Sequence, residues 1–307
     1  MNQEKLHKHL NNNPFSLAPM AGYSDVPFRT ICRKMGAGIL FTEFVSSSFI
    51  IKESRRALKM ASFTNMEMPL IVQIFGHDAD ELLLAAQKIE ETKPSGIELN
   101  LGCSVKKIAL KGSGATLLND PKKIMHILKQ LNKNLSVPIS AKIRIGIDEE
   151  NLNYLEVAKI VEQAGCWLLT VHGRTKNMKY SQQALWQPIG EIAHHISIPV
   201  IGNGDINSLA MAKEFKRKYN LNGIAIGRAA QGRPWIFTEE EFSRKRKILV
   251  VLEHLKSMLE FYGEEQGLLL FRKHLVRYFR DLGIENGEYY FTQNNSTKLI
   301  EDLKSLI

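Results

Sequence analysis

The chain has 307 residues, of which 44% are hydrophobic and 24% are charged, so it is long enough to bury a large core. The first residues, MNQEKLHKHLNNNPF, lack the apolar segment of a secretory signal, and no run approaches the roughly 20 apolar residues that span a bilayer. The three cysteines, Cys32, Cys103 and Cys166, lack metal-ligand spacing and indicate neither a disulfide framework nor a zinc site. We therefore expect a cytoplasmic protein with no membrane and no metal partner.

The net charge of +9 is unevenly distributed. Residues 1–235 carry 30 Lys and Arg against 20 Asp and Glu, whereas residues 236–307 carry 11 against 12. A basic excess favours polyanionic partners, among them nucleic acid.

Eight short runs rich in Ile, Val and Leu have the pattern of buried strands. They are FSLAPM (15–20), ILFTEF (39–44), LIVQIFG (70–76), GIELNLG (96–102), VPISAKIRIG (137–146), LLTVHGR (168–174), IPVIGNGD (198–205) and GIAIGRA (223–229). Helical patterns occupy several gaps, at 78–92, 120–133 and 153–165. Nearly continuous apolar strands joined by helices predict a parallel (β/α)₈ TIM barrel over residues 1–237, with an open doubly wound sheet as the alternative.

Three helical patterns follow the barrel, at about 247–262, 268–282 and 296–306, and they predict a small all-α domain over residues 238–307. The middle helix is amphipathic. Its apolar side is formed by Leu268, Phe271, Leu275, Phe279 and Leu282. Lys273, Arg277 and Arg280 lie on the opposite side and form a basic stripe, which we interpret as an RNA contact or as an ordinary solvated face.

Polar residues gather where the predicted strands end, which is where barrel enzymes place their chemistry. GNGD at 202–205 and IGR at 226–228 are typical of a phosphate site, because glycines let backbone N–H groups approach the anion and the arginine neutralises it. Lys142 and His172 end neighbouring strands and are suited to hold the polar end of a ring. A phosphorylated planar cofactor fits this pattern.

The segments APMAGYSDVPFR, NLGCSVKKI, AKIRIG, VHGRT, IGNGDI and IGRAAQGRPWIF together resemble the tRNA-dihydrouridine synthase family. FRKHLVRYF stands where members carry an Arg-Lys-His-rich helix in an RNA-binding domain. The resemblance implies an FMN-dependent barrel that reduces a uracil ring in folded RNA, most often tRNA, to 5,6-dihydrouracil. It also implies NADPH or NADH as the electron donor, and we expect a monomer.

By this resemblance, a set of residues at the strand ends would bind FMN: Pro19, Met20, Ala21, Gln73, Lys142, His172, Asn203, Gly204, Asp205, Gly227 and Arg228. Asn100, Lys106 and Arg174 would contact the RNA or the target base, together with the basic stripe. Cys103 would be the general acid that protonates C5 after hydride delivery to C6, since a thiol is mostly protonated at neutral pH. Ser104 stands where the family usually has proline, which predicts a less rigid loop.

Two other functions fit the residues. The first is an FMN barrel oxidoreductase that acts on a small molecule, in the manner of dihydroorotate dehydrogenase; such an enzyme needs no basic helical tail. The second is a barrel aldolase or lyase that uses Lys142 as a Schiff-base nucleophile.

Overall fold

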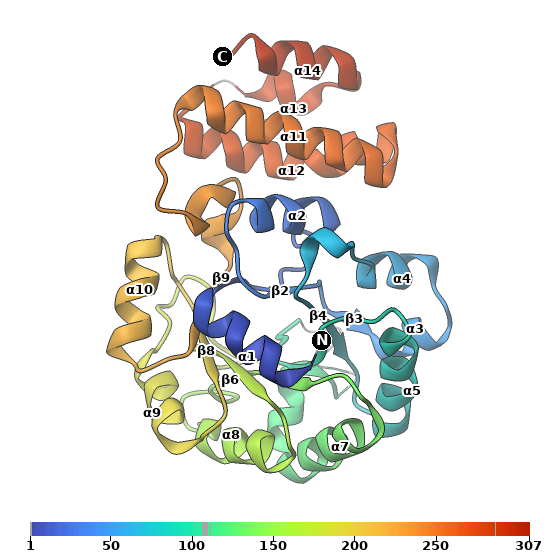
Figure 1. Cartoon of the computed structure of the whole chain (residues 1–307), viewed down its shortest axis with the longest axis vertical. Helices are drawn as coiled ribbons and strands as arrows, with labels where there is room; N and C mark the ends of the chain where they lie inside the picture. Colours follow the sequence, from blue (N-terminus) through green and yellow to red (C-terminus); the bar gives the residue numbers. More distant parts are fainter. Residues whose placement is uncertain (1, 106–109, 111, 286) are drawn as a thin grey trace.

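The computed structural model describes residues 2–105, 110, 112–285 and 287–307 (Figure 1). Its strands are β1 (Phe15–Leu17), β2 (Leu40–Phe41), β3 (Val45–Ser46), β4 (Leu70–Phe75), β5 (Gly96–Leu101), β6 (Ile139–Arg144), β7 (Leu168–His172), β8 (Val200–Asn203) and β9 (Gly223–Ile226). These strands pair in parallel, and β1 pairs with both β2 and β9 while β2 also pairs with β4. The pairings close the sheet into a barrel, so the prediction of a TIM barrel is confirmed and the open sheet is wrong.

Each of the eight predicted runs contains a strand of the barrel; β3 is an additional two-residue strand that pairs with the end of β4. The helices around the barrel are α1 (Gln3–Asn12), α2 (Val26–Lys34), α3 (Ser47–Ile51), α4 (Arg55–Ala61), α5 (Ala79–Glu90), α7 (Pro121–Asn134), α8 (Tyr154–Gln163), α9 (Gln187–His195) and α10 (Leu209–Lys218). Short 3₁₀ helices lie at Asn65–Glu67, Gly114–Asn119, Arg228–Ala230 and Pro234–Phe237. The three predicted barrel helices correspond to α5, α7 and α8.

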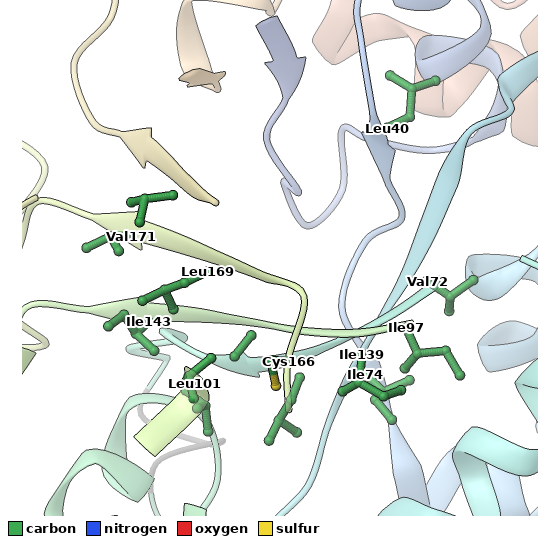
Figure 2. Packing of buried hydrophobic residues seen from close by; sticks show 14 of the residues in the cluster. Leu40, Val72, Ile74, Ile97, Leu101, Ile139, Ile143, Cys166, Leu169 and Val171 are labelled. Atoms are coloured by element: carbon green, nitrogen blue, oxygen red, sulfur yellow. The ribbon is translucent and has the colours of Figure 1, made fainter. Parts of the chain in front are cut away.

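Alternation along the strands sorts side chains into two sets. In β5, Ile97, Leu99 and Leu101 point outward into the main core, and Glu98 and Asn100 lie between them in the sequence. Several strands contribute such outward-pointing apolar side chains to the core. Figure 2 labels Val72, Ile74, Ile139, Ile143, Leu169 and Val171 among them. Because successive side chains of a strand point to opposite faces, the polar residues between these apolar ones point into the barrel.

The N-terminal end of the barrel is covered by α1, which crosses it in Figure 1. Asn2 caps this helix by accepting a hydrogen bond from the Lys5 amide at 3.0 Å. Leu6 and Leu10 are buried in one cluster with Trp167 and with inward-pointing residues of the strands. The sequence patterns do not predict this helix, which forms an apolar floor under the barrel.

The C-terminal helices lie together beside the barrel (Figure 1), and their apolar side chains form a second core. They are α11 (Arg244–Tyr262), α12 (Glu264–Leu282), α13 (Glu288–Thr292) and α14 (Ser296–Lys304). The expected all-α tail is therefore present, with α13 as an addition to the three predicted helices. Ile31 of α2 and Trp235 belong to the same apolar cluster, so the tail packs directly on the barrel. Across the described ranges, no helix is both long and apolar enough to span a bilayer.

Candidate functional site

A cavity of about 650 Å³ opens at the C-terminal ends of the strands. Its lining includes most of the residues that the sequence motifs single out: Pro19, Met20, Ala21, Asn100, Cys103, Lys142, His172, Arg174, Asn203, Gly204, Asp205, Gly227, Arg228 and Arg277. Gln73 is fully buried and lies beside Glu98 in the strand register, and it does not line the cavity. Lys106 lies outside the described residues. The strand ends therefore bring the predicted set together around one space.

Lys142 is held by a network of buried polar groups. Its Nζ donates to Asn203 Oδ1 at 3.2 Å, and Asn203 Nδ2 donates to the Ala225 carbonyl at 2.8 Å. Burial lowers the pKa of Lys142 to about 8, while the nearby Glu98 carboxylate favours the ammonium form. Asn203 thus positions the Lys142 ammonium group at the wall of the cavity.

Glu98 is a fully buried carboxyl group that no sequence motif indicates. Gln73 Nε2 donates to Glu98 Oε2, and Thr170 Oγ1 donates to Glu98 Oε1 at 3.2 Å. Burial raises the pKa of Glu98 to about 7, against the opposing effects of the Gln73 hydrogen bond and the Lys142 charge. Glu98 and Lys142 are therefore an electrostatically coupled pair, and each favours the charged form of the other.

The predicted phosphate-binding end is organised by Asp205. Its carboxylate accepts hydrogen bonds from Arg174 Nη2 and Arg228 Nη2, both at 2.6 Å, and from the Ala184 amide at 2.8 Å. The Arg174 and Arg228 guanidinium groups lie over the Tyr180 ring, 5.6 and 4.6 Å from its centroid. Asp205 therefore holds two cations in place, and Arg228 remains about half exposed at the cavity.

His172 is neutral in this environment. Arg174 Nη1 lies 3.1 Å from His172 Nε2, and a guanidinium only donates, so Nε2 accepts and the ring proton resides on Nδ1. Burial, followed by the surrounding Lys and Arg charges, holds the pKa of His172 well below its ordinary value. The ring therefore contributes shape and hydrogen bonding to the site without a charge.

Cys103 is held by two polar side chains beside the cavity. Asn100 Oδ1 accepts hydrogen bonds from the amides of Gly102, at 3.1 Å, and Cys103, at 2.9 Å. Arg144 Nε donates to the Gly102 carbonyl at 2.7 Å, and Arg144 Nη2 reaches Ser104 Oγ at 3.4 Å, a contact that proline at position 104 cannot make. Burial raises the pKa of the Cys103 thiol, so this thiol is protonated at neutral pH.

Arg144 and Tyr180, like Glu98, are site residues outside the predicted set. Arg144 ends β6, two residues after Lys142, and its Nη1 donates to the Thr175 carbonyl at 2.6 Å. The same alternation that points to Lys142 indicates Arg144. Tyr180 lies in a loop, and no sequence pattern indicates its position against Arg228.

The basic residues of α12 turn toward the barrel rather than uniformly to solvent. Arg277 lines the cavity, and Gly232 packs so closely against the α12 backbone that an added Cβ would lie 2.2 Å from the Arg277 carbonyl carbon. Lys273 Nζ lies over the Tyr23 ring at 5.4 Å, and Arg280 is exposed. The predicted stripe therefore extends from the cavity mouth to the outer surface.

The fold and the site define a TIM-barrel enzyme whose cavity is lined by cations, glycines and one thiol. The model of the dihydrouridine synthase family matches residues 16–306. The chain is 39% identical over 289 residues to tRNA-dihydrouridine synthase B of Pseudomonas putida, covering 91% of this chain and 86% of that protein. It is 34% identical to a probable tRNA-dihydrouridine synthase of Rickettsia bellii, covering 85% and 84% of the two chains.

The chain belongs to the dihydrouridine synthase family, whose chemistry depends on a flavin. Among solved structures, histamine dehydrogenase from Rhizobium sp. 4-9 has the same fold, with a TM-score of 0.55 at 13% identity over 89% of this chain and 51% of that one. Family membership confirms the resemblance seen in the sequence and decides against both the small-molecule oxidoreductase and the Schiff-base aldolase.

Proposed function

We propose that this enzyme reduces a uridine of tRNA to 5,6-dihydrouridine, with FMN as its cofactor and with NADPH or NADH as the electron donor. The observation that carries the proposal is the sharing of one cavity by the Cys103 thiol, the Lys142 ammonium group and the Arg228 guanidinium group. A proton donor, a cation for an electron-rich ring and a cation for a phosphate are the groups that this reaction requires.

The residues of the cavity fit FMN. An added Cβ at Gly227 would extend toward Ala18 and Met20, 3.7 Å from each, so the glycine leaves room for a ligand at this wall. Arg228 is oriented by Asp205 and Tyr180 and is available to the phosphate. Lys142 is suited to the polar edge of the isoalloxazine ring, where a cation stabilises the reduced form. Gln73 acts on the flavin site through Glu98, and Asp205 acts through Arg174 and Arg228. The remaining proposed FMN residues are Pro19, Met20, Ala21, Gln73, His172, Asn203, Gly204 and Asp205.

FMN held by these residues would supply the hydride for C6 of uracil. Negative charge then develops at C5 and at the 4-carbonyl oxygen, and the Cys103 Sγ–H donates its proton to C5. Asn100 and Arg144 hold the backbone on both sides of Cys103, so the thiol is positioned before the base arrives. A raised thiol pKa keeps the proton available at neutral pH.

We further propose a division of labour between residues 1–237, which carry the chemistry, and residues 238–307, which bind RNA. Lys273, Arg277 and Arg280 are the proposed phosphate contacts of α12, and Arg277 places that surface at the cavity mouth. Asn100 and Arg174 face the base, and Lys106 belongs to the same proposed RNA contact. The enzyme acts as a monomer in the cytoplasm, where its tRNA substrate and reduced nicotinamide are found, and the reaction itself needs no metal.

The proposal is tested with purified enzyme and unmodified tRNA. We expect flavin absorbance, release of FMN on denaturation, and formation of dihydrouridine in tRNA that depends on NADPH or NADH and is detected by mass spectrometry of nucleosides. Arg228→Ala and Lys142→Ala are expected to purify with depleted flavin.

Arg217→Ala, an exposed arginine on α10, is the matched control and should retain a full complement of FMN. Full flavin content in both Arg228→Ala and Lys142→Ala would show that the cofactor site is elsewhere. An enzyme that holds FMN but leaves every uridine of tRNA unchanged would contradict the proposed substrate.

A further inference from the structure

Three buried metal-ligand side chains meet where the helical tail packs on the barrel. Asp25 is the N-cap of α2, His254 lies in α11 and His274 lies in α12. Their relative exposures are 6%, 0% and 0%, so none of them is a surface group. One ligand atom from each side chain lies within 4.8 Å of the ligand atoms of the other two. The cluster is separate from the catalytic cavity, whose lining includes none of the three.

The two imidazoles lack the partners that buried polar groups normally have. His254 Nδ1 lies 3.0 Å from the Tyr278 hydroxyl, but His254 Nε2 and both nitrogens of His274 are buried without a hydrogen-bond partner. Most buried polar atoms in proteins are satisfied, so three unsatisfied nitrogens at one place require an explanation. A shared ligand between the rings supplies one.

The ligand side chains are oriented in the way that metal sites require. Tyr278 fixes the ring of His254, and the Tyr262 hydroxyl donates to Asp25 Oδ2 at 3.1 Å. Partners of this kind hold metal ligands in position and adjust their basicity. Phe28 packs against both imidazoles, with ring centroids 5.6 and 5.3 Å away, and makes the surroundings apolar.

The charged groups around the cluster balance one another. Burial raises the pKa of Asp25 and of the nearby Glu43, and the charges of Lys273 and Arg29 oppose this effect. Arg29 is already paired with the buried Glu67 at 2.7 Å. With Arg33, which donates to the Glu67 carbonyl at 2.9 Å, the neighbourhood holds three carboxyl groups and three cations beside the two imidazoles.

The three ligand atoms are close enough for one small ion to contact all of them after the side chains move slightly toward each other. A point between three atoms that lie no more than 4.8 Å apart can be within about 2.8 Å of each, whereas Zn²⁺ bonds to His and Asp are roughly 2.0–2.2 Å. Each ligand therefore moves by less than about 1 Å, which small rotations of the side chains provide.

We propose that Asp25, His254 and His274 bind a divalent transition-metal ion of the zinc class, with water as the fourth ligand. Two imidazoles and one carboxylate are a ligand set that zinc accepts and that Mg²⁺ and Ca²⁺ do not favour. The ion joins α2 of the barrel to α11 and α12 and so fixes the tail over the cavity mouth. The expectation of no metal partner rests on cysteine spacing, which does not bear on this cluster.

The test is zinc binding by the complete protein. Protein treated with a chelator is dialysed against micromolar ZnCl₂, and its zinc content is measured by elemental analysis. We expect one Zn²⁺ per chain in the unaltered protein and in His126→Gln, which removes an exposed histidine of α7. His274→Gln and His254→Gln should lose this zinc, and Tyr262→Phe should weaken binding roughly 10- to 100-fold.

X-ray absorption of the zinc-loaded unaltered protein gives a second result that does not depend on the folding of any variant. Two imidazoles with oxygen ligands and no sulfur support the proposal. An unaltered protein that binds no zinc, zinc retained in His274→Gln, or a sulfur ligand would each overturn it. If the unaltered protein binds no zinc, the ligand shared by the two imidazoles is water.

Discussion

The position of Cys103 follows from a few specific contacts. Asn100 caps the backbone N–H groups at the start of the loop, and Arg144 binds the Gly102 carbonyl from the neighbouring strand. Cys103 as a residue is 8% exposed, and burial raises the pKa of its thiol. A protonated and immobilised thiol is suited to general-acid catalysis and poorly suited to nucleophilic attack, which requires the thiolate.

Cys103→Ala should therefore bind flavin and accept electrons from NADPH, yet form dihydrouridine slowly. Loss of a positioned general acid costs roughly 10²- to 10⁴-fold in rate, and serine should not restore it because an alcohol is far less acidic than a thiol. The measurement is dihydrouridine formed in tRNA by pre-reduced enzyme in a single turnover. Cys166→Ser is the control, since Cys166 is a core residue near Asn132. Equal rates for Cys103→Ala and the unaltered enzyme would make Cys103 structural.

Glu98→Gln should lower the pKa of Lys142 further. The carboxylate favours the ammonium form, and the amide keeps its shape without the charge, so the pKa of about 8 should fall by roughly 1–3 units. NMR titration of the Lys142 side chain in flavin-free protein measures this directly. Thr170→Val removes a hydrogen bond to Glu98 and leaves the charge, so it should shift the pKa of Lys142 much less. Identical titrations of the Gln variant and the unaltered protein would show that the pair is not coupled.

The same carboxyl group gives stability a defined pH dependence. Its pKa is about 7 in the folded protein, against an ordinary value of 4.5. The folded chain therefore binds more protons than the unfolded chain between these values, and it loses stability as pH rises through them. Glu98→Gln removes this loss, so urea unfolding at pH 5 and pH 7 should show a smaller decrease in the free energy of unfolding for the variant. An equal decrease in both proteins would mean that Glu98 is already ionised at pH 5.

At this scale the sequence predicts the residues that end strands and form recognisable motifs, such as Lys142 and Arg228. It does not predict Glu98, because a single polar residue inside an apolar run does not reveal which groups face it across the barrel. His254 and Asp25 are separated by more than 200 residues and meet only through packing. Contacts of this kind depend on tertiary structure, which a linear pattern does not contain.

Among the elements, α12 connects the tail to the catalytic cavity. Its apolar face is buried as the 3.6-residue period predicts, with Phe271, Leu275 and Phe279 in the second core. The predicted basic side is divided between the cavity mouth, where Arg277 lies, and the surface, where Arg280 is exposed. The helix therefore contributes one charge, Arg277, to the cavity that Cys103 also lines.

Arg277→Gln combined with Arg280→Gln should weaken tRNA binding and flatten its dependence on salt. For each phosphate that the variant no longer neutralises, the slope of log affinity against log salt should fall by roughly 0.7 to 0.9. Affinity measured at several salt concentrations tests this, and the flavin content of the variant should be unchanged. Lys256→Gln on the exposed side of α11 is the control. Unchanged affinity and slope in the double variant would mean that the stripe is an ordinary solvated surface.

The other elements show why patterns succeed or fail. Fully buried parallel strands have apolar sequences because both of their faces are covered, and such runs predict all eight barrel strands. The pattern of α1 is weak because its packing depends on two residues, Leu6 and Leu10, whose partner Trp167 is distant in the sequence. β3 is only two residues long, and it is recognisable as a strand only because it pairs with β4.

In the whole molecule, a residue of a barrel helix belongs to the core of the tail, so the barrel and the tail should unfold together. Ile31 belongs to α2 of the barrel but is fully buried in the core of the tail. Ile31→Ala should lower the free energy of unfolding by about 2–5 kcal/mol, as measured by urea unfolding. Trp235 reports on the tail core and Trp167 on the barrel floor. Single-tryptophan variants should therefore give coincident transitions.

Leu84→Ala, at a side chain that is 54% exposed on α5, should change the free energy of unfolding by less than about 0.5 kcal/mol. Separate transitions reported by Trp235 and Trp167 would show that barrel and tail are independent folding units, contrary to this expectation.

The apolar floor made by α1 has a kinetic consequence. With Leu6 and Leu10 closing the far end of the barrel, the described residues leave the cavity open at the strand ends alone. In the proposed reaction, the nicotinamide that delivers electrons and the uridine that receives them would then enter through the same mouth, and Arg277 of α12 lines it. We therefore expect them to occupy the mouth in turn, so that one departs before the other arrives. Steady-state rates should give parallel lines in double-reciprocal plots, and intersecting lines would indicate that both substrates bind at once.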